Sequence, residues 1–368
     1  MANLGKTIAL GLSGGVDSAV SALLLQQQGY QVTGVRFPCL NQAHCQLSQD
    51  QQDAAQVAKI LGIPFQQIEL PAARKQYIID YFLEEYQKGR TPNPDVICNQ
   101  TIKFGWFYDW AIEQGFDYIA TGHYACIIEQ DEQYFLGTSK DQHKDQTYFL
   151  HRLQEQQLEK IKFPLGNLLK TEIRQIATTN NLPVAEKKDS TGLCFVCDMS
   201  VRQYLSQQLG QKTGEVVTQD GAVIGQHQGA WLYTIGQRRG FSVNKKLVQQ
   251  NTKLLDKNQD LPALFVIGKN AKKNQLIVGT KNETQADQFE IKNLHLINPN
   301  FKEKLNQQQL KVKIRHTGKI INCQLQQKKD GWLVKAQEKV AGAAPGQFAV
   351  FYTCVNDSQI CLGGGEIA

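Results

Sequence analysis

Residues 10–25 read LGLSGGVDSAVSALLL, and this stretch decides the fold of the first half of the chain. An apolar strand runs into Ser13, Gly14 and Gly15, and Val16 then opens an amphipathic helix. Glycines let the backbone approach an anion, successive N–H groups form a nest, and a helix N-terminus adds positive potential. The loop has neither the Gly-Lys-Ser/Thr ending of a P-loop nor a G-x-G-x-x-G pattern. From these residues alone, a phosphate site and a plain tight turn both stay open.

Outward from this loop, strand and helix signals alternate through the N-terminal half. Apolar strand-like runs occur at 7–12, 31–37 and 117–121, with helical periodicity at 16–29, 48–62 and 77–89. Such alternation predicts an α/β fold with a parallel sheet, helices on both faces, and functional groups at the carboxyl ends of the strands.

After about residue 210, helical periodicity largely gives way to short β-type runs cut by Gly, Asn and Asp. We therefore predict an α/β domain over 1–209, a small linking domain over 210–284 and a β-barrel-like domain over 285–368.

Charge is divided unevenly along the chain, although the net charge is only +6. Residues 1–237 hold 19 Lys and Arg against 24 Asp and Glu, whereas residues 238–368 hold 21 against 10. The basic second half predicts contact with a polyanion such as RNA or DNA, and solvated lysines on strand surfaces are the alternative. The first residues read as a buried strand, and no run approaches the roughly 20 apolar residues of a membrane span, so we expect a cytoplasmic protein.

The nine cysteines are odd in number and irregularly spaced, which argues against a disulfide framework. Cys194 and Cys197, in TGLCFVC (191–197), form the only Cys-x-x-Cys pair. Such a pair suits half of a zinc site, a redox couple, or one working thiol beside a bystander. A structural zinc site takes four ligands, and the chain offers no second pair, so we expect no tightly bound metal.

Several motifs together resemble one family. The string SGGVDS is similar to the pyrophosphate loop of the N-type ATP pyrophosphatases, which have an adenine nucleotide hydrolase-like fold. The further strings GRTPNPDVICNQTIKF, TGHY, KDQTYFL, KDSTGLCF, HQGAWLYTIGQRRG, PGQFAVFY and CLGGG follow in order over nearly the whole chain. With the loop, they resemble the tRNA-specific 2-thiouridylases.

The resemblance implies that ATP adenylates the C2 oxygen of the wobble uridine of tRNA, and that a persulfide then supplies sulfur to give 2-thiouridine, AMP and pyrophosphate. It implies Cys194 as the persulfide carrier and Cys98 as the partner nucleophile, which leaves a Cys98–Cys194 disulfide for a cellular reductant to open. A persulfide donor or relay protein and Mg²⁺ with the ATP are also expected.

Further site residues are carried over from the same resemblance. The expected ATP contacts are Gly11, Leu12, Ser13, Gly14, Gly15, Val16, Asp17, Ser18, Phe37 and Gly122. The expected tRNA contacts are Asn93, Pro94, Asp95, His123, Lys144, Asp145, Gln146, Arg315, His316 and Gln347.

The chain departs from the family pattern at a few positions. RFPCLNQAHC (36–45) replaces a usual Met-Lys-Asn-Trp segment, and His316 replaces a common tyrosine. Cys39, Cys45 and Cys197 have no role that the resemblance supplies. Two other functions fit parts of the sequence: an enzyme of the same superfamily acting on a free amino acid or nucleotide, and a zinc-dependent RNA-binding module. The first function gives no role to the basic β-rich half of the chain. The second lacks a full set of four zinc ligands.

Overall fold

The computed structural model describes residues 3–37, 47–189, 199–252, 260–302, 305 and 309–368. A five-stranded parallel sheet organises the N-terminal half, in the order β3-β2-β1-β4-β7. Its strands are β1 (Thr7–Gly11), β2 (Gln31–Arg36), β3 (Phe65–Gln67), β4 (Tyr118–Ala120) and β7 (Ile161–Lys162). The chain leaves β1 toward β2 on one side and later returns to β4 on the other, so the strand order reverses between β1 and β4. A crevice at the carboxyl end of this reversal is where open α/β sheets bind ligands.

Alternation along β1 divides the core between the two faces of the sheet. Ile8 and Leu10 pack with helices α1 (Val16–Gln27), α2 (Leu47–Leu61) and α8 (Lys170–Thr179). Ala9 faces the opposite cluster, to which α3 (Ala72–Gln87), α4 (Pro94–Cys98) and α5 (Phe107–Glu113) contribute. The predicted parallel sheet with helices on both faces is therefore confirmed. No helix among the described residues is long and apolar enough to cross a membrane.

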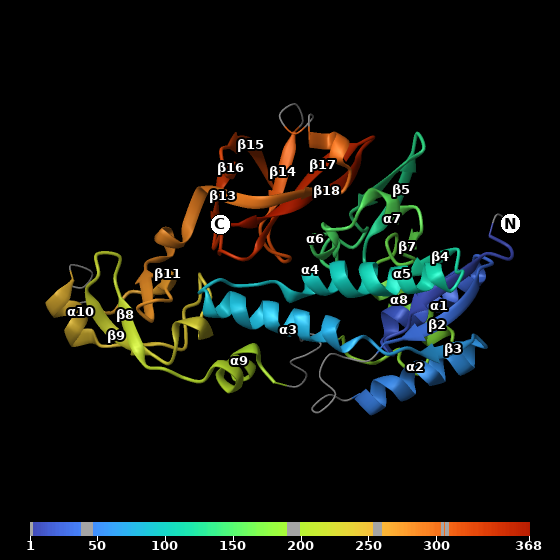
Figure 1. Cartoon of the computed structure of the whole chain (residues 1–368), viewed down its shortest axis with the longest axis horizontal. Coiled ribbons are helices and arrows are strands. Elements are labelled where there is room, and N and C mark those ends of the chain that lie inside the picture. Colours follow the sequence, from blue (N-terminus) through green and yellow to red (C-terminus); the bar gives the residue numbers. More distant parts are fainter. Residues whose placement is uncertain (1–2, 38–46, 190–198, 253–259, 303–304, 306–308) are drawn as a thin grey trace.

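A second sheet, with the order β10-β9-β8-β12-β11, lies at the far end of α3 from the parallel sheet (Figure 1). It consists of β8 (Gly214–Val217), β9 (Val223–His227), β10 (Ser242–Val243), β11 (Phe265–Asn270) and β12 (Gln275–Gly279). Helix α9 (Val201–Leu209) leads into it, and α10 (Lys245–Asn251) packs on β9.

The C-terminal strands close into an antiparallel barrel. They are β13 (Gln285–Leu296), β14 (Leu310–Lys313), β15 (Ile321–Lys328), β16 (Gly331–Ala341), β17 (Phe348–Val355) and β18 (Ser358–Ile367). Besides the run β13-β16-β15-β14-β17-β18, β13 pairs with β18 and completes the barrel. The predicted β-barrel is thus present.

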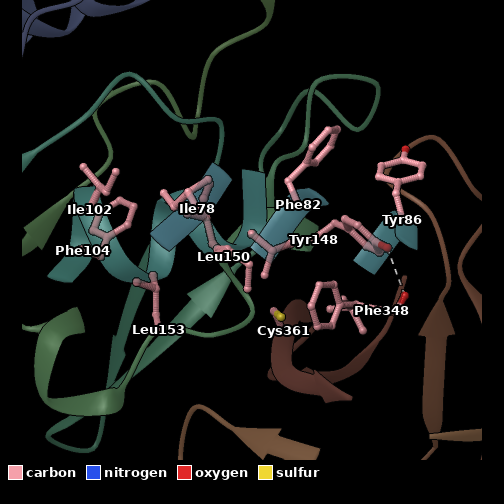
Figure 2. Close-up of a cluster of buried hydrophobic side chains, with 14 of the residues drawn as sticks. Ile78, Phe82, Tyr86, Ile102, Phe104, Tyr148, Leu150, Leu153, Phe348 and Cys361 are labelled. Carbon is pink, nitrogen blue, oxygen red and sulfur yellow. Dashed lines mark hydrogen bonds between the residues drawn. The ribbon is translucent and has the colours of Figure 1, made fainter. Parts of the chain in front are cut away.

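One hairpin joins the two halves of the chain, which the sequence did not predict. Strands β5 (Cys126–Gln130) and β6 (Gln133–Gly137) follow the parallel sheet in sequence but extend the barrel sheet, because β6 pairs with β18. Nearby, the buried Tyr148 of α6 (Thr147–Leu150) donates a hydrogen bond of 3.0 Å to the Phe348 carbonyl (Figure 2). The barrel is therefore packed onto the catalytic half through a shared core.

Candidate active site

The predicted phosphate loop connects β1 to α1 at the reversal of the strand order. The Ser13 N–H donates to Ser18 Oγ at 3.2 Å, and Ser18 Oγ donates to the Gly15 carbonyl at 3.0 Å. Gly15 is the N-cap of α1 and no side chain caps that helix end. The loop is thus folded on itself while the α1 N-terminus keeps N–H groups for an anion.

Gly14 lets the loop lie against α2. Its φ is +82°, and a Cβ there would lie 2.3 Å from the Asp50 carbonyl oxygen of α2. Only glycine satisfies both the left-handed backbone and the close approach.

Two cations bind the carbonyl side of the loop. Lys187 Nζ donates to the Gly14 carbonyl at 2.9 Å, to Asp50 at 2.7 Å, and to Asp53. Arg36, at the end of β2, donates to the Ser13 carbonyl at 3.4 Å. The cations bind the carbonyl oxygens of Ser13 and Gly14. The N–H groups of the same loop are left to bind a phosphate.

Asp17, in the first turn of α1, carries a charge network behind the loop. It accepts from Tyr124 Oη at 2.8 Å and from Lys170 Nζ at 2.7 Å. Lys170 also pairs at 2.8 Å with Asp189, which in turn pairs with Lys144 at 2.7 Å. Burial opposes the ionisation of Asp189, but these ion pairs outweigh it and hold the pKa of this carboxyl at about 2.

Gly122 meets the phosphate loop across the strand reversal. A Cβ at Gly122 would lie 3.0 Å from Ser18 N and from the Asp17 carbonyl carbon, so the two predicted ATP segments are adjacent. Phe37, after β2, is half-buried, with its ring centroid 5.3 Å from that of Phe107 and 6.1 Å from that of Trp106. Its contact with ATP stays a prediction.

Cys98 ends the short helix α4. Asn93 is the N-cap and accepts from Val96 N–H at 3.4 Å, and Pro94 occupies the first turn, where a backbone N–H would have no acceptor within the helix. A π-helical stretch (Asn99–Trp106) follows directly, and such stretches are frequent at functional sites. Cys98 is half-buried at this junction.

Asp95 lies one turn before Cys98, on the same side of α4. Solvent reaches its side chain, yet surrounding protein raises the pKa of its carboxyl, opposed by the charge of Lys103. Lys103 also lies 3.4 Å from Nε2 of the buried His123. Burial, aided by Lys103, keeps the pKa of His123 well below its usual range, so its ring is neutral. Thr121 Oγ1 contacts the other ring nitrogen at 2.7 Å.

The KDQ segment has three different environments. Lys144 is partly exposed and pairs with Asp189. Asp145 is buried, accepting from Ser139 N–H at 3.1 Å and Thr147 Oγ1 at 2.7 Å, and burial raises its pKa. Gln146 accepts from Tyr124 N–H at 2.9 Å. The side chains of Asp145 and Gln146 therefore support the fold here, and only Lys144 reaches the surface with a charge.

The barrel brings its predicted residues to the Cys98 segment. Gln347 donates to the carbonyls of Thr91 and Pro92 at 2.8 and 3.2 Å, just before Asn93. His316 packs against Phe149, with 4.4 Å between ring centroids and 34° between ring planes, and burial lowers the pKa of His316 to about 4. Arg315 is exposed and donates to the Gly342 carbonyl, in the turn after β16, at 3.1 Å.

Some predicted residues lie outside the part that the structure describes. Cys194, the predicted persulfide carrier, is among them, as are Cys39, Cys45 and Cys197. Within the described ranges, no three His, Cys, Asp or Glu side chains converge as metal ligands.

Sequence reasoning missed most of the charged residues around the loop. Asp189 lies in the string KDSTGLCF and Lys187 comes two residues before Asp189, so the motif pointed to this segment without giving either residue a role. Lys170 opens a helix in no recognised motif, and only the tertiary structure brings it to Asp17.

Comparison with known proteins matches three family models along the chain. They are the tRNA methyl transferase HUP domain at residues 6–198, the tRNA methyl transferase PRC-barrel domain at 202–280, and the aminomethyltransferase beta-barrel domain at 286–367.

Curated relatives match over almost the full length. The tRNA-specific 2-thiouridylase MnmA of Chromobacterium violaceum is 40% identical over 98% of this chain and 92% of that protein. The protein of the same name from Pediococcus pentosaceus is 39% identical over 98% of this chain and 94% of its own. Among solved structures, a 4-thiouridine synthetase–RNA complex with bound ATP is 17% identical over 55% of this chain and 50% of that chain. Its TM-score of 0.35 is too low to support a conclusion.

Proposed function

The chain belongs to the tRNA-specific 2-thiouridylase family, and from that premise we propose how its residues catalyse ATP-dependent 2-thiolation of the wobble uridine of tRNA. The observation that carries the proposal is full-length similarity to curated 2-thiouridylases at 40% identity. The enzyme is a tRNA sulfurtransferase, and ATP is its second substrate.

ATP binds with its phosphates on the loop of residues 11–18 and its nucleoside toward Gly122 and Phe37. The support is the α1 N-terminus, the carbonyls tied back by Lys187 and Arg36, and the contact of Gly122 with the loop. Attack of the uridine C2 oxygen on the α-phosphate forms an adenylated base and releases pyrophosphate. Adenylation makes this oxygen a leaving group, which it is not in uridine itself.

Sulfur transfer then uses two thiols. The Cys98 thiolate attacks the Cys194 sulfur of a Cys194 persulfide, so that a Cys98–Cys194 disulfide forms and the persulfide S–S bond breaks. The terminal sulfur keeps the electron pair, attacks C2 and expels AMP, giving 2-thiouridine. A cellular dithiol reductant returns both cysteines to thiols, and a persulfide donor or relay protein reloads Cys194.

Asp95 is suited to proton transfer in these steps. Its raised pKa keeps a larger share of the acid form than an ordinary aspartate has, and it lies one helical turn from Cys98. We propose that Asp95 takes up and later releases the proton that the uridine ring loses when its C2 position is activated.

We propose that tRNA lies across the Cys98 segment and the barrel. Residues 301–335 of the barrel carry nine Lys and Arg against two acids, which favours a phosphate backbone. The target base lies among Asn93, Pro94 and Asp95. The rest of the tRNA is bound by residues that contact it directly or hold the contacting residues in place: His123, Lys144, Asp145, Gln146, Arg315, His316 and Gln347. Reaching a base of the anticodon loop requires turning it out of its stack, and the His316–Phe149 pair offers an aromatic surface there.

Mg²⁺ is expected to accompany ATP, bound chiefly by the phosphates. Asp17 is the loop carboxylate that fits as a ligand, because Mg²⁺ takes one or two carboxylates besides phosphate oxygens and waters. We place the reaction in the cytoplasm, where thiols are kept reduced.

The test is mass spectrometry of tRNA nucleosides after incubation with ATP and a persulfide source. Wild-type protein should convert the wobble uridine to 2-thiouridine. Cys98→Ala and Cys194→Ala should each abolish the product, while Cys197→Ala retains most of it. Loss of activity in Cys197→Ala equal to that in Cys194→Ala would overturn the persulfide assignment, and stoichiometric zinc in purified protein would favour the metal-binding alternative.

A further inference from the structure

Lys170 is the first residue of α8 and reaches the phosphate loop from outside it. Its ammonium lies 2.7 and 2.9 Å from the two carboxylate oxygens of Asp17 and 2.8 Å from Asp189. The side chain is 12% exposed. Its backbone is fixed as well, since the Lys170 N–H donates to the Asp141 carboxylate at 3.0 Å. A positive charge is therefore held beside the loop by an anchored helix end.

Asp17 creates an electrostatic conflict that this charge can relieve. The loop suits a polyanion, yet the Asp17 carboxylate stands in the first turn of the same helix. A triphosphate next to an uncompensated carboxylate is repelled, and the repulsion is larger at a partly buried site than in water. A cation beside Asp17 relieves this repulsion: Lys170 supplies it in the nucleotide-free protein, and the Mg²⁺ expected with ATP would supply it once Lys170 turns to the phosphates.

Two other cations contact the loop in the described ranges, but both are committed to its backbone. Lys187 donates to the Gly14 carbonyl and to the carboxylates of Asp50 and Asp53, which uses its three N–H groups. Arg36 donates to the Ser13 carbonyl. If Lys187 or Arg36 turned toward a phosphate, a loop carbonyl would lose its hydrogen bond. The acceptors of Lys170 are side-chain carboxylates, which can rotate.

Movement of Lys170 would leave neither carboxylate without a partner. Asp17 keeps its hydrogen bond from Tyr124 at 2.8 Å. Asp189 keeps Lys144 at 2.7 Å and Arg174 at 3.0 Å. Asp189 therefore stays charge-compensated when Lys170 turns toward the phosphates, while Asp17 stays hydrogen-bonded and is left to the Mg²⁺ that is expected with ATP.

We propose that Lys170 is a phosphate-binding residue: it is the counter-ion of Asp17 in the nucleotide-free protein, and its ammonium binds the β- and γ-phosphates when ATP occupies the loop. This rests on the proposed function, in which ATP is split between its α- and β-phosphates. In that step negative charge develops on the departing pyrophosphate, and Lys170 stabilises it.

Calorimetric binding of a non-hydrolysable ATP analogue and of AMP to the full-length protein tests the proposal, because AMP lacks the two outer phosphates. Lys170→Gln should weaken the ATP analogue roughly 10- to 100-fold, the usual effect of losing a charged hydrogen bond, and leave AMP within about 2-fold. Lys170→Arg should keep most of the ATP-analogue affinity. The matched control is Lys140→Gln, since Lys140 pairs with Glu172 of the same helix at the exposed surface and should leave both ligands unaffected.

Equal loss of AMP and ATP-analogue affinity in Lys170→Gln would show that Lys170 only shapes the loop and would overturn the proposal. An ATP-analogue affinity within about 2-fold of wild type would overturn it too. Should Lys170→Gln not fold, acetylation of lysines in the wild-type protein replaces it: the ATP analogue should protect Lys170 and AMP should not, and unchanged labelling refutes the proposal. Wild-type protein that binds neither nucleotide would instead overturn the proposed function, and this inference with it.

Discussion

Substituting Gly14 by alanine should damage the phosphate loop, while the same substitution at the adjacent Gly15 should not destabilise it. Gly14 has φ +82°, where an L-residue costs roughly 1–2 kcal/mol. Its new Cβ would lie 2.3 Å from the Asp50 carbonyl oxygen, so the loop must move off α2, at roughly 1–3 kcal/mol more. Together these amount to about 2–5 kcal/mol of lost stability.

Gly15 provides the matched control, because its backbone has φ −99° and ψ 164°, which alanine adopts freely. The nearest atom to a Cβ there is Ser13 Oγ at 3.5 Å, an ordinary contact.

Thermal unfolding and ATP binding check this prediction. At about 2–4 °C per kcal/mol for a domain of this size, Gly14→Ala should lower Tm by at least about 4 °C. Displacement of the loop should also weaken ATP binding at least about 10-fold. Gly15→Ala should keep Tm within about 1 °C of wild type. The reasoning is refuted if Gly14→Ala melts and binds ATP as the wild type does, or if Gly15→Ala is equally unstable.

Three further predictions concern other parts of the molecule. Gln347→Leu removes both hydrogen bonds to the Thr91–Pro92 carbonyls and should lower tRNA thiolation several-fold while ATP binding is retained; equal loss of both would contradict it. Asp189 has its pKa lowered from 3.8 to about 2, so its ion pairs stabilise the fold above about pH 4 and that contribution disappears as pH falls toward 2. The destabilisation by Asp189→Asn, measured by urea unfolding, should therefore be smaller at about pH 3 than at about pH 6. Burial raises the pKa of Cys126 to about 11, whereas Cys354 is exposed. Iodoacetamide near neutral pH should therefore alkylate Cys354 far faster than Cys126, which peptide mass spectrometry would measure.

Local sequence predicted the parallel sheet and the phosphate loop because their signals are short-range. The strand of residues 7–11, the loop and α1 follow one another directly, and apolar periodicity with two glycines specifies each of them. The barrel was predicted in outline from short β-type runs for the same reason. The pairing of β6 with β18 was not predicted. It joins Gly137 to Ile360, which are far apart in the sequence, and the local sequence of a strand does not specify its partner strand.

The residues of the site divide in the same way. By itself the sequence determined the family, the phosphate loop and the choice of Cys98 and Cys194 as candidates, since those residue types recur in contiguous motifs. Only the tertiary structure decided that Lys170 lies on Asp17 and that Gln347 of the barrel holds the loop before Cys98. It also decided that Asp145 is buried and not a surface charge. Charge pairing and burial depend on distances through space, and motifs list residues without fixing those distances.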